Sequence, residues 1–392
     1  MQFPEAEWQV ETLIQHLGEE EKILGAVAPP LFITSNFAFE NVEDWHKAYL
    51  EPFTGPFMYS RMTNPTLRMA ETKIAALEGT EACKLFSSGM AAISAAIFSC
   101  VKSGDHVIAV DTIYGPTKEL LTKYLPKFGV ECTYVSGVSL EEIAEAARPE
   151  TTLLVLESPS SFFFHLQDLE ALSQWAKPLG ITTMIDNSYA TPIRQQPAKF
   201  GIDIVCHSAT KYLGGHSDVV AGALCCSRER MIELLKNEIA LFGGALHPFG
   251  AWQIMRGLRT LPIKVKAVAE TADKVAAWVR SQPWVSETFH VGFDDFPQSE
   301  LRDRQMSGWT GLFSFVPQCQ DQSKVTRFLE ALHLFQLGAS WGGHESLAVG
   351  LPHSSILRPE TTWVVRLYCG LEHPDDLIRD VRQAALAAGW VS

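Results

Sequence analysis

Residues 201–216 read Gly-Ile-Asp-Ile-Val-Cys-His-Ser-Ala-Thr-Lys-Tyr-Leu-Gly-Gly-His, an apolar run followed by polar residues, one lysine and two glycines. The apolar run predicts a short buried strand over Asp203–Cys206. Ser208 and Thr210 follow at alternate positions, so their hydroxyls can lie on one side of an extended segment beside Lys211. The stretch therefore predicts a strand whose carboxyl end carries one amine and two hydroxyl groups.

Strand and helix patterns alternate through the part of the chain that precedes this stretch. Helices are expected first at Thr66–Leu77 and Gly89–Val101. Strands then follow at His106–Val110, Cys132–Val135, Thr152–Leu156 and Thr182–Ile185, with helices between them at Thr117–Leu125, Leu140–Ala147 and Leu166–Leu179. Such alternation, with strands rich in Val, Ile and Leu, is typical of an α/β fold with a mostly parallel central sheet and helices on both faces. Ligands bind such sheets beyond the carboxyl ends of the strands.

The C-terminal third predicts a smaller α+β domain. One long helix over Gly250–Gln282, broken near Pro262, leads into it. Strands are expected at Thr310–Val316, Gln336–Ser340 and Thr362–Tyr368, and helices at Ser323–Leu332 and Pro374–Ala388. We expect a large domain at residues 61–258 and a C-terminal domain at 259–392.

Residues 1–60 are expected to form an arm that contributes to a neighbouring subunit. A helix is expected at Trp8–His16, and the rest of the arm is interrupted by Pro and Gly and is expected to be irregular. The arm carries too many aromatic residues for a disordered tail, among them Trp45 and Tyr49.

Composition narrows the classes of function. The chain has 392 residues, of which 46% are hydrophobic and 20% charged, as in ordinary globular proteins. A net charge of −13 argues against nucleic acid as a partner. The eight cysteines are scattered without metal-ligand spacing, so no metal is predicted, and reduced thiols favour a cytoplasmic protein. Residues 1–7 lack the basic and apolar regions of a signal peptide, and no stretch of about 18 apolar residues predicts a membrane span.

Polar residues at other element ends suggest what Lys211 does. Asp186 directly follows the strand Thr182–Ile185, and Tyr114 lies just beyond the strand His106–Val110. Ser88 and Gly89 form a turn before a helix, whose N-terminal N–H groups suit a phosphate. Each feature alone also suits a turn, a cap or a packing aromatic. Together they supply a carboxylate for a pyridine nitrogen, donors for a phosphate, a ring for stacking and an amine for a Schiff base, which are the parts that a pyridoxal-phosphate enzyme needs.

Six motifs in the same order resemble the Cys/Met-metabolism family of pyridoxal-phosphate-dependent enzymes, which includes cystathionine γ-synthase, cystathionine β- and γ-lyases and methionine γ-lyase. The resemblance runs from about Ala28 to the C-terminus. The motifs are Tyr59-Ser60-Arg61 with Asn64-Pro65-Thr66; Ser88-Gly89-Met90-Ala91-Ala92; Asp186-Asn187; His207 to Tyr212 with Gly215-His216-Ser217-Asp218; Ser340 with Gly342-Gly343 and Glu345-Ser346-Leu347; and Val365-Arg366-Leu367 with Gly370-Leu371-Glu372.

The resemblance implies the fold type I pyridoxal-phosphate-dependent transferase architecture and a large domain that binds pyridoxal 5'-phosphate. Lys211 would carry the cofactor as a Schiff base and also move protons, and Asp186 would bind its ring nitrogen. Gly89, Met90, Ser208 and Thr210 would bind its phosphate, and Tyr114 would stack on its ring. Tyr59 and Arg61 would reach the phosphate of a neighbouring subunit. The catalytic residues are then Lys211, Tyr114 and Tyr59. Family members are commonly homotetramers built from two tight dimers.

On the substrate side, the resemblance implies that Arg366 holds the carboxylate of a small amino acid, with help from Ser340. Ser161 and Trp341 complete the expected substrate site. Whether Phe162, Phe163, Phe164 and His344 shape this pocket or only pack the core stays open.

The residues that bear on the reaction type match the branches of the family less consistently than the residues expected to bind the cofactor. Most relatives have Asn near the position of Ser161, and a bacterial cystathionine β-lyase branch lacks it. The same branch has Trp where Trp341 stands, whereas typical γ-lyases have Leu. Pro116 stands where methionine γ-lyases have Cys, and Ala339 where animal-type γ-lyases have Glu. The motifs at Asn64-Pro65-Thr66 and Ser88-Gly89-Met90 nevertheless look like the γ branch.

We therefore expect a carbon–sulfur lyase that acts on cystathionine-like amino acids by α,β-elimination. The alternative is a γ-lyase or a γ-replacement enzyme acting on methionine, cystathionine or an O-substituted homoserine. A nicotinamide dehydrogenase would need a GxGxxG motif after its first strand, which the sequence lacks. A non-catalytic binding or regulatory homologue would be expected to have lost Lys211 or Asp186, and the sequence retains both.

Overall fold

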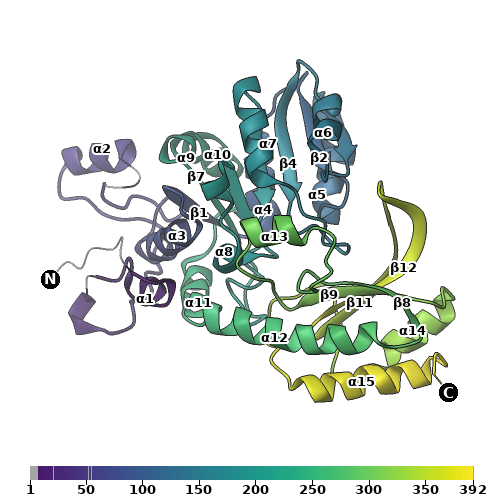
Figure 1. Cartoon of the computed structure of the whole chain (residues 1–392). Helices are drawn as coiled ribbons and strands as arrows, with labels where there is room; N and C mark the ends of the chain where they lie inside the picture. Colours follow the sequence, from purple (N-terminus) through teal and green to yellow (C-terminus); the bar gives the residue numbers. More distant parts are fainter. Residues whose placement is uncertain (1–7, 21, 52, 54, 392) are drawn as a thin grey trace.

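The computed structural model of the chain describes residues 8–391 except 21, 52 and 54, and contains two sheets joined by a long helix (Figure 1). Residues 1–7, on which the signal-peptide prediction rests, lie outside this part. Among the described residues, no helix is long and apolar enough to cross a membrane.

The first sheet has seven strands in the order β1-β7-β6-β5-β4-β2-β3. Its strands are β1 (Ala82–Phe86), β2 (His106–Val110), β3 (Glu131–Val135), β4 (Thr151–Glu157), β5 (Thr182–Asp186), β6 (Ile204–His207) and β7 (Gly222–Cys226). Strand β7 runs antiparallel to β1 and β6, and the other neighbouring strands pair in parallel, so the prediction of a mostly parallel sheet is confirmed. The parallel strands bring their carboxyl ends to one edge, and residues after β4, β5 and β6 meet there.

Helices cover both faces of this sheet (Figure 1). The helices of this part of the chain are α3 (Pro65–Glu78), α4 (Gly89–Phe98), α5 (Gly115–Glu119), α6 (Leu140–Ala146), α7 (Leu169–Ala176), α8 (Thr191–Arg194), α9 (Arg228–Leu234), α10 (Ala240–Phe242) and α11 (Pro248–Leu258). Their apolar faces and the strands form one large buried cluster. Local signals set their ends: Asn64 and Pro65 begin α3, and Gly79 ends it with a left-handed φ of 71°.

The second sheet has five strands in the order β10-β11-β12-β9-β8 and is mostly antiparallel. Its strands are β8 (Val285–Phe289), β9 (Leu312–Pro317), β10 (Gln336–Leu337), β11 (Leu347–Ser355) and β12 (Arg358–Tyr368). The helices of this part are α12 (Leu261–Arg280), α13 (Ser299–Gln305), α14 (Gln322–Ala331) and α15 (Pro374–Ala387). Figure 1 shows α12 and α15 running side by side along one side of this sheet, and they are in contact. The smaller α+β unit predicted from the sequence is therefore present.

Several predicted elements need correction. The arm has α1 (Val10–His16), as expected, but also a second helix, α2 (Val42–Leu50), where irregular structure was predicted. Asn41 begins α2 by accepting a hydrogen bond from the Asp44 N–H at 2.8 Å. The predicted strand Gln336–Ser340 is confined to β10, and the predicted helix from Leu166 begins only at Leu169, after the cap residue Asp168.

The predicted long helix over Gly250–Gln282 is two helices, α11 and α12, with the break just before Pro262. Proline fits the first turn of α12 because the N–H groups there have no partner within the helix. The sequence patterns also missed four strands: β1, β7, β8 and β11. The first two are rich in Ala, Gly and Cys, which carry little strand signal.

Helix α11 packs directly against the turn that follows Lys211. A Cβ atom on Gly257 would collide with the carbonyl oxygens of Leu213 and Gly214, which are backbone atoms and cannot rotate away. Gly257 thus allows α11 to approach the lysine turn closely.

We predict that Gly257→Ala destabilises the protein by about 2–3 kcal/mol, because the added methyl group must push the lysine turn away from α11. Gly250→Ala in the same helix is the matched control. The atoms nearest to its Cβ would belong to the side chain of Leu246, which can shift, so the change is expected to stay within about 1 kcal/mol. Urea unfolding of both variants measures the difference, and equal stabilities would contradict the close approach.

Candidate active site

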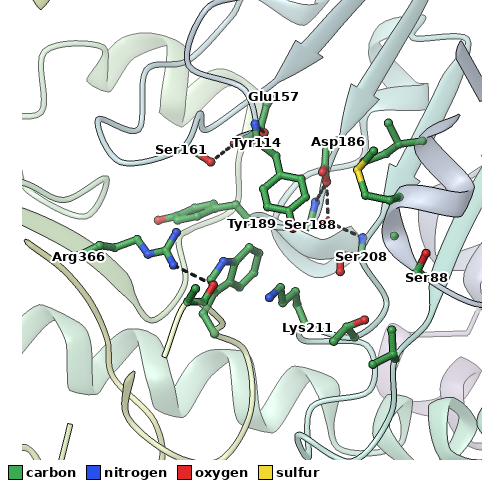
Figure 2. Close-up of a pocket in the computed structure, with 17 residues that line it drawn as sticks. Ser88, Tyr114, Glu157, Ser161, Asp186, Ser188, Tyr189, Ser208, Lys211 and Arg366 are labelled. Carbon is green, nitrogen blue, oxygen red and sulfur yellow. Dashed lines mark hydrogen bonds between the residues drawn. The ribbon is translucent and has the colours of Figure 1, made fainter. Parts of the chain in front are cut away.

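A cavity of about 260 Å³ lies at the carboxyl ends of β4, β5 and β6 and is closed by residues of the second sheet. Figure 2 shows these side chains converging from both sides. The lining residues are Ser88, Gly89, Met90, Ile93, Tyr114, Glu157, Ser161, Asp186, Ser188, Tyr189, Ser208, Thr210, Lys211, Val220, Ala339, Trp341 and Arg366. Most of the residues predicted from the sequence therefore meet in one place.

Lys211 lies in the turn after β6 and points into the cavity (Figure 2). Its Nζ donates a hydrogen bond to the Ser340 hydroxyl at 2.6 Å and lies 5.3 Å from the centroid of the Trp341 ring. Burial, with a smaller contribution from the positive charge of Arg366, lowers the pKa of Lys211 to about 8. At neutral pH such an amine is unprotonated often enough to act as a nucleophile and as a base.

Asp186 ends β5 and is held by Ser188. The Ser188 N–H and hydroxyl both donate to one Asp186 oxygen, at 2.9 and 2.5 Å. Burial raises the pKa of Asp186, and the two hydrogen bonds from Ser188 oppose that rise. A positively charged partner in the cavity would favour the ionised carboxylate, as a protonated pyridine nitrogen would.

Glu157 is a site residue to which the sequence patterns assigned no role. It ends β4 directly beside Asp186 in the strand register, and it is buried. It accepts hydrogen bonds from the Tyr114 N–H at 2.7 Å and the Ser161 hydroxyl at 2.6 Å. Burial and the neighbouring Asp186 raise the pKa of Glu157 to about 8. Glu157 thus holds the backbone of Tyr114 and the hydroxyl of Ser161 beside the carboxylate at the end of β5. A charged residue at the end of an apolar strand was the available signal.

The start of α4 forms a cradle beside Ser208. A Cβ on Gly89 would lie 2.9 Å from the Cβ of Ser208, so only glycine lets the helix start come this close. Ser88 caps the helix through the Ala91 N–H at 3.1 Å. The Ser208 N–H donates to the Ser188 hydroxyl at 2.6 Å, and the Thr210 hydroxyl bonds to the backbone of Ala221.

Tyr114 and Arg366 face the cavity from opposite sheets. Figure 2 shows the Tyr114 ring projecting into the cavity above Lys211, with Asp186 to one side. Arg366 comes from β12, and its guanidinium donates to the Ala339 carbonyl at 3.4 Å. Burial lowers the pKa of Arg366 to about 10, so it stays charged at neutral pH. The pocket therefore has a cation positioned for a carboxylate opposite the lysine.

Some predicted residues lie apart. Tyr59 and Arg61 do not line the cavity: Tyr59 is exposed, and the Arg61 guanidinium donates to the Ala240 carbonyl and lies 5.5 Å from the Tyr59 ring. Ser340 does not line the cavity, but its hydroxyl accepts a hydrogen bond from Lys211 Nζ. His344 contacts Glu345 away from the cavity lining.

The three consecutive phenylalanines after Ser161 divide between two roles. Phe163 and Phe164 are buried core residues. Phe162 lies under the Arg366 guanidinium, whose central carbon is 5.0 Å from the ring centroid.

Comparisons with known proteins all match this chain to one family of enzymes. A model of the family "Cys/Met metabolism PLP-dependent enzyme" matches residues 11–386. A cystathionine gamma-lyase of Bacillus subtilis is 37% identical, covering 95% of this chain and 98% of the relative. An L-methionine gamma-lyase of Porphyromonas gingivalis is 37% identical over 94% of both chains. A cystathionine beta-lyase of Lactococcus lactis subsp. cremoris is 36% identical, covering 96% of this chain and 98% of the relative. The solved structure of metB from Corynebacterium glutamicum superposes with a TM-score of 0.89 at 30% identity, covering 97% of this chain and 99% of that one.

The residues present fit pyridoxal 5'-phosphate, the cofactor of that family. A lysine with a lowered pKa, a buried carboxylate held by Ser188, and a helix start opened by Gly89 beside Ser208 line one cavity. These are an amine for the aldehyde, an anion for the ring nitrogen and N–H groups for the phosphate.

We predict that Glu157→Gln removes a pH-dependent loss of stability. Because the pKa of Glu157 is about 8, above its ordinary value of 4.5, the folded chain keeps a proton that the unfolded chain has lost between these values. The resulting stabilisation is fully present below pH 4.5 and is lost as the pH rises through 8. The thermal midpoint of Glu157→Gln relative to the natural protein should therefore rise from pH 5 to pH 8.5 in the cofactor-free form.

Glu141→Gln is the control. The Ser139 hydroxyl lowers the pKa of the exposed Glu141, so this carboxyl group does not titrate in this pH range. Parallel pH profiles for Glu157→Gln and the natural protein would show that Glu157 is ionised throughout.

Proposed function

This chain belongs to the Cys/Met metabolism family of pyridoxal-phosphate-dependent enzymes, and we propose that within the family it acts on cystathionine-like amino acids by α,β-elimination. It is a pyridoxal-phosphate-dependent carbon–sulfur lyase whose substrate is an amino acid. The proposal concerns which bond is broken and which residues take part.

Lys211 is the proposed cofactor lysine and proton carrier. Its ε-amine would hold the cofactor aldehyde, Asp186 its ring nitrogen, and the helix start at Gly89 and Met90 with Ser208 and Thr210 its phosphate. The Tyr114 ring would stack on the cofactor. When bound, the cofactor supplies an electron sink for the negative charge left at the substrate α-carbon. Once free of the aldehyde, Lys211 Nζ would take the α-proton, and Arg366 would hold the substrate carboxylate.

The contacts of Lys211 support β- over γ-elimination. β-elimination needs one proton removed, from Cα, before the thiolate leaves Cβ. γ-elimination needs a second proton, from Cβ, so the amine must reach a second carbon. Lys211 Nζ is bonded to Ser340 at 2.6 Å and lies against the Trp341 ring, and both contacts restrict its movement. These two contacts of Lys211 are the observations on which the proposal depends.

γ-Elimination is the second candidate. Two of the relatives at 37% identity are named as γ-lyases, of cystathionine and of methionine. A γ-replacement on an O-substituted homoserine would begin with the same two proton transfers.

We also propose a cytoplasmic homotetramer of two dimers with shared active sites. Tyr59 and Arg61, which lie outside the cavity of their own chain, would complete the phosphate site of the neighbouring subunit. The exposed arm residues Trp45, Tyr49 and Leu50 support this arrangement. The proposed domains are the arm at 1–60, the cofactor-binding domain at 61–258 and the C-terminal domain at 259–392. All eight cysteines are free.

The keto acid formed from L-cystathionine tests the proposal. We expect pyruvate, homocysteine and ammonia as the main products, because one proton is removed and the Cβ–S bond breaks. 2-Oxobutyrate and cysteine would instead mark γ-elimination, and L-methionine and O-acetylhomoserine should then also react. Trp341→Leu is expected to raise the 2-oxobutyrate fraction several-fold, because it frees Lys211. A main product of 2-oxobutyrate in the natural protein would reject the proposal.

Borohydride reduction tests the cofactor lysine against a matched control. Lys264 is also buried, with a pKa of about 8, but it donates to the Tyr212 carbonyl at 3.1 Å outside the cavity. We expect borohydride to bleach the yellow protein and attach the cofactor to the peptide containing Lys211. Lys211→Met should abolish the attachment and lower activity by at least about 10³-fold, whereas Lys264→Met should keep both. Attachment at any other lysine would refute the assignment.

A further inference from the structure

We propose that Phe162 and His353 position the guanidinium of Arg366, and so set the affinity of the pocket for a substrate carboxylate. The inference rests on the proposed function, in which Arg366 binds that carboxylate. It adds two positioning residues, one from the loop after β4 and one from the hairpin of the second sheet.

Hydrogen bonds alone hold Arg366 weakly. Within the described part of the chain, its guanidinium makes one hydrogen bond, of 3.4 Å, to the Ala339 carbonyl, and it takes part in no ion pair. The ring of Phe162 lies under it, with the central guanidinium carbon 5.0 Å from the ring centroid. An aromatic face attracts a guanidinium, and more strongly where water is partly excluded. The ring leaves the N–H groups free for an incoming carboxylate.

The Phe162 ring is held by a loop with an unusual backbone. Phe162 and Phe164 have φ angles of 64° and 56°, in the left-handed region that bulky residues avoid. Backbone hydrogen bonds fix the loop at both ends: the Ser161 N–H donates to the Thr112 carbonyl at 3.1 Å, and the Phe164 N–H to the Ser160 carbonyl at 3.1 Å. Residues held in such conformations concentrate at functional sites.

His353 packs against the same ring from the second sheet. Its ring centroid lies 4.7 Å from that of Phe162 and 5.2 Å from that of Phe163. Its Nε2 is buried without a hydrogen-bond partner among the described residues. His353 lies near the tip of the β11–β12 hairpin, and the next turn is tied to the first sheet by the Ile356 N–H, which donates to Asp111 at 2.6 Å. Figure 1 shows β12 extending from the second sheet toward the region of α5.

The alternative is that Phe162 only fills space. If Phe162 only fills space, replacing it would change the stability of the protein and the affinity for every ligand alike. If it supports Arg366, replacing it would weaken the binding only of ligands that carry a carboxylate. L-Alanine and ethylamine separate the two roles, because they differ by that carboxylate alone. Their dissociation constants follow from the change in cofactor absorbance when each is added to the holoenzyme.

We expect Phe162→Leu to weaken L-alanine binding about tenfold and to change ethylamine binding less than about twofold. Phe162→Tyr keeps the ring and should stay within about twofold for both ligands. His353→Ala should weaken L-alanine binding about threefold, and His353→Phe should restore it. In turnover, Phe162→Leu should raise KM about tenfold with kcat within about twofold, for whichever amino acid the enzyme cleaves.

Unchanged L-alanine binding in Phe162→Leu, or equal losses for the two ligands, would overturn the inference. If Phe162→Leu fails to fold, the comparison of His353→Ala with His353→Phe decides it in the same way. In one outcome, the natural protein binds cofactor and forms a keto acid while its variants show no loss specific to the carboxylate ligand. That result would refute this inference and leave the proposed function standing. A natural protein with no cofactor absorbance after reconstitution refutes the proposed function as well.

Discussion

The site depends on the balance of charge among four ionisable side chains that share one largely buried cavity. Asp186 and Glu157 lie side by side at the ends of β5 and β4, and Lys211 and Arg366 share the same cavity. Buried charges are costly unless they are paired or neutralised, so the shifts in pKa have one common origin. Burial and, to a smaller extent, the neighbouring Asp186 raise the pKa of Glu157 to about 8, and burial with a smaller contribution from Arg366 lowers the pKa of Lys211 to about 8. Ser188, Ser161 and Ser340 each hold one of these groups in place.

Much of the fold could be predicted because its parallel strands are apolar runs separated by helical patterns. The strand His106–Val110 was predicted with its observed bounds, and β4, β5 and β6 within a residue at each end. The antiparallel strand β7 could not be predicted, because Gly-Ala-Leu-Cys-Cys has little strand propensity. Its burial comes from β1 and β6, which lie on either side. Helix α2 was missed because the surrounding prolines and glycines outweighed the single cap at Asn41.

The candidate site was predictable where a residue follows a strand or begins a helix, as Asp186, Gly89 and Lys211 do. Arg366 could be placed only through resemblance, because one arginine in a strand carries no local signal. Glu157 received no role, since its importance comes from the register that sets it beside Asp186. The contact of Phe162 with Arg366 depends on how two sheets meet, which no pattern in one segment encodes.

The division of the pocket between two sheets also orders its assembly on the ribosome. Asp186 ends a strand of the first sheet, and Gly89 and Lys211 lie beside that sheet, whose last strand ends at Cys226, whereas Trp341 and Arg366 are made more than 100 residues later. Chains emerge from the N-terminus, and N-terminal domains generally fold first. The groups proposed to hold the cofactor can therefore be in place before the groups proposed to hold the substrate have been synthesised. The Ile356 N–H in the β11–β12 turn, which donates to Asp111, joins the two halves, so the groups proposed to bind the cofactor and those proposed to bind the substrate belong to parts of the chain that are synthesised at different times.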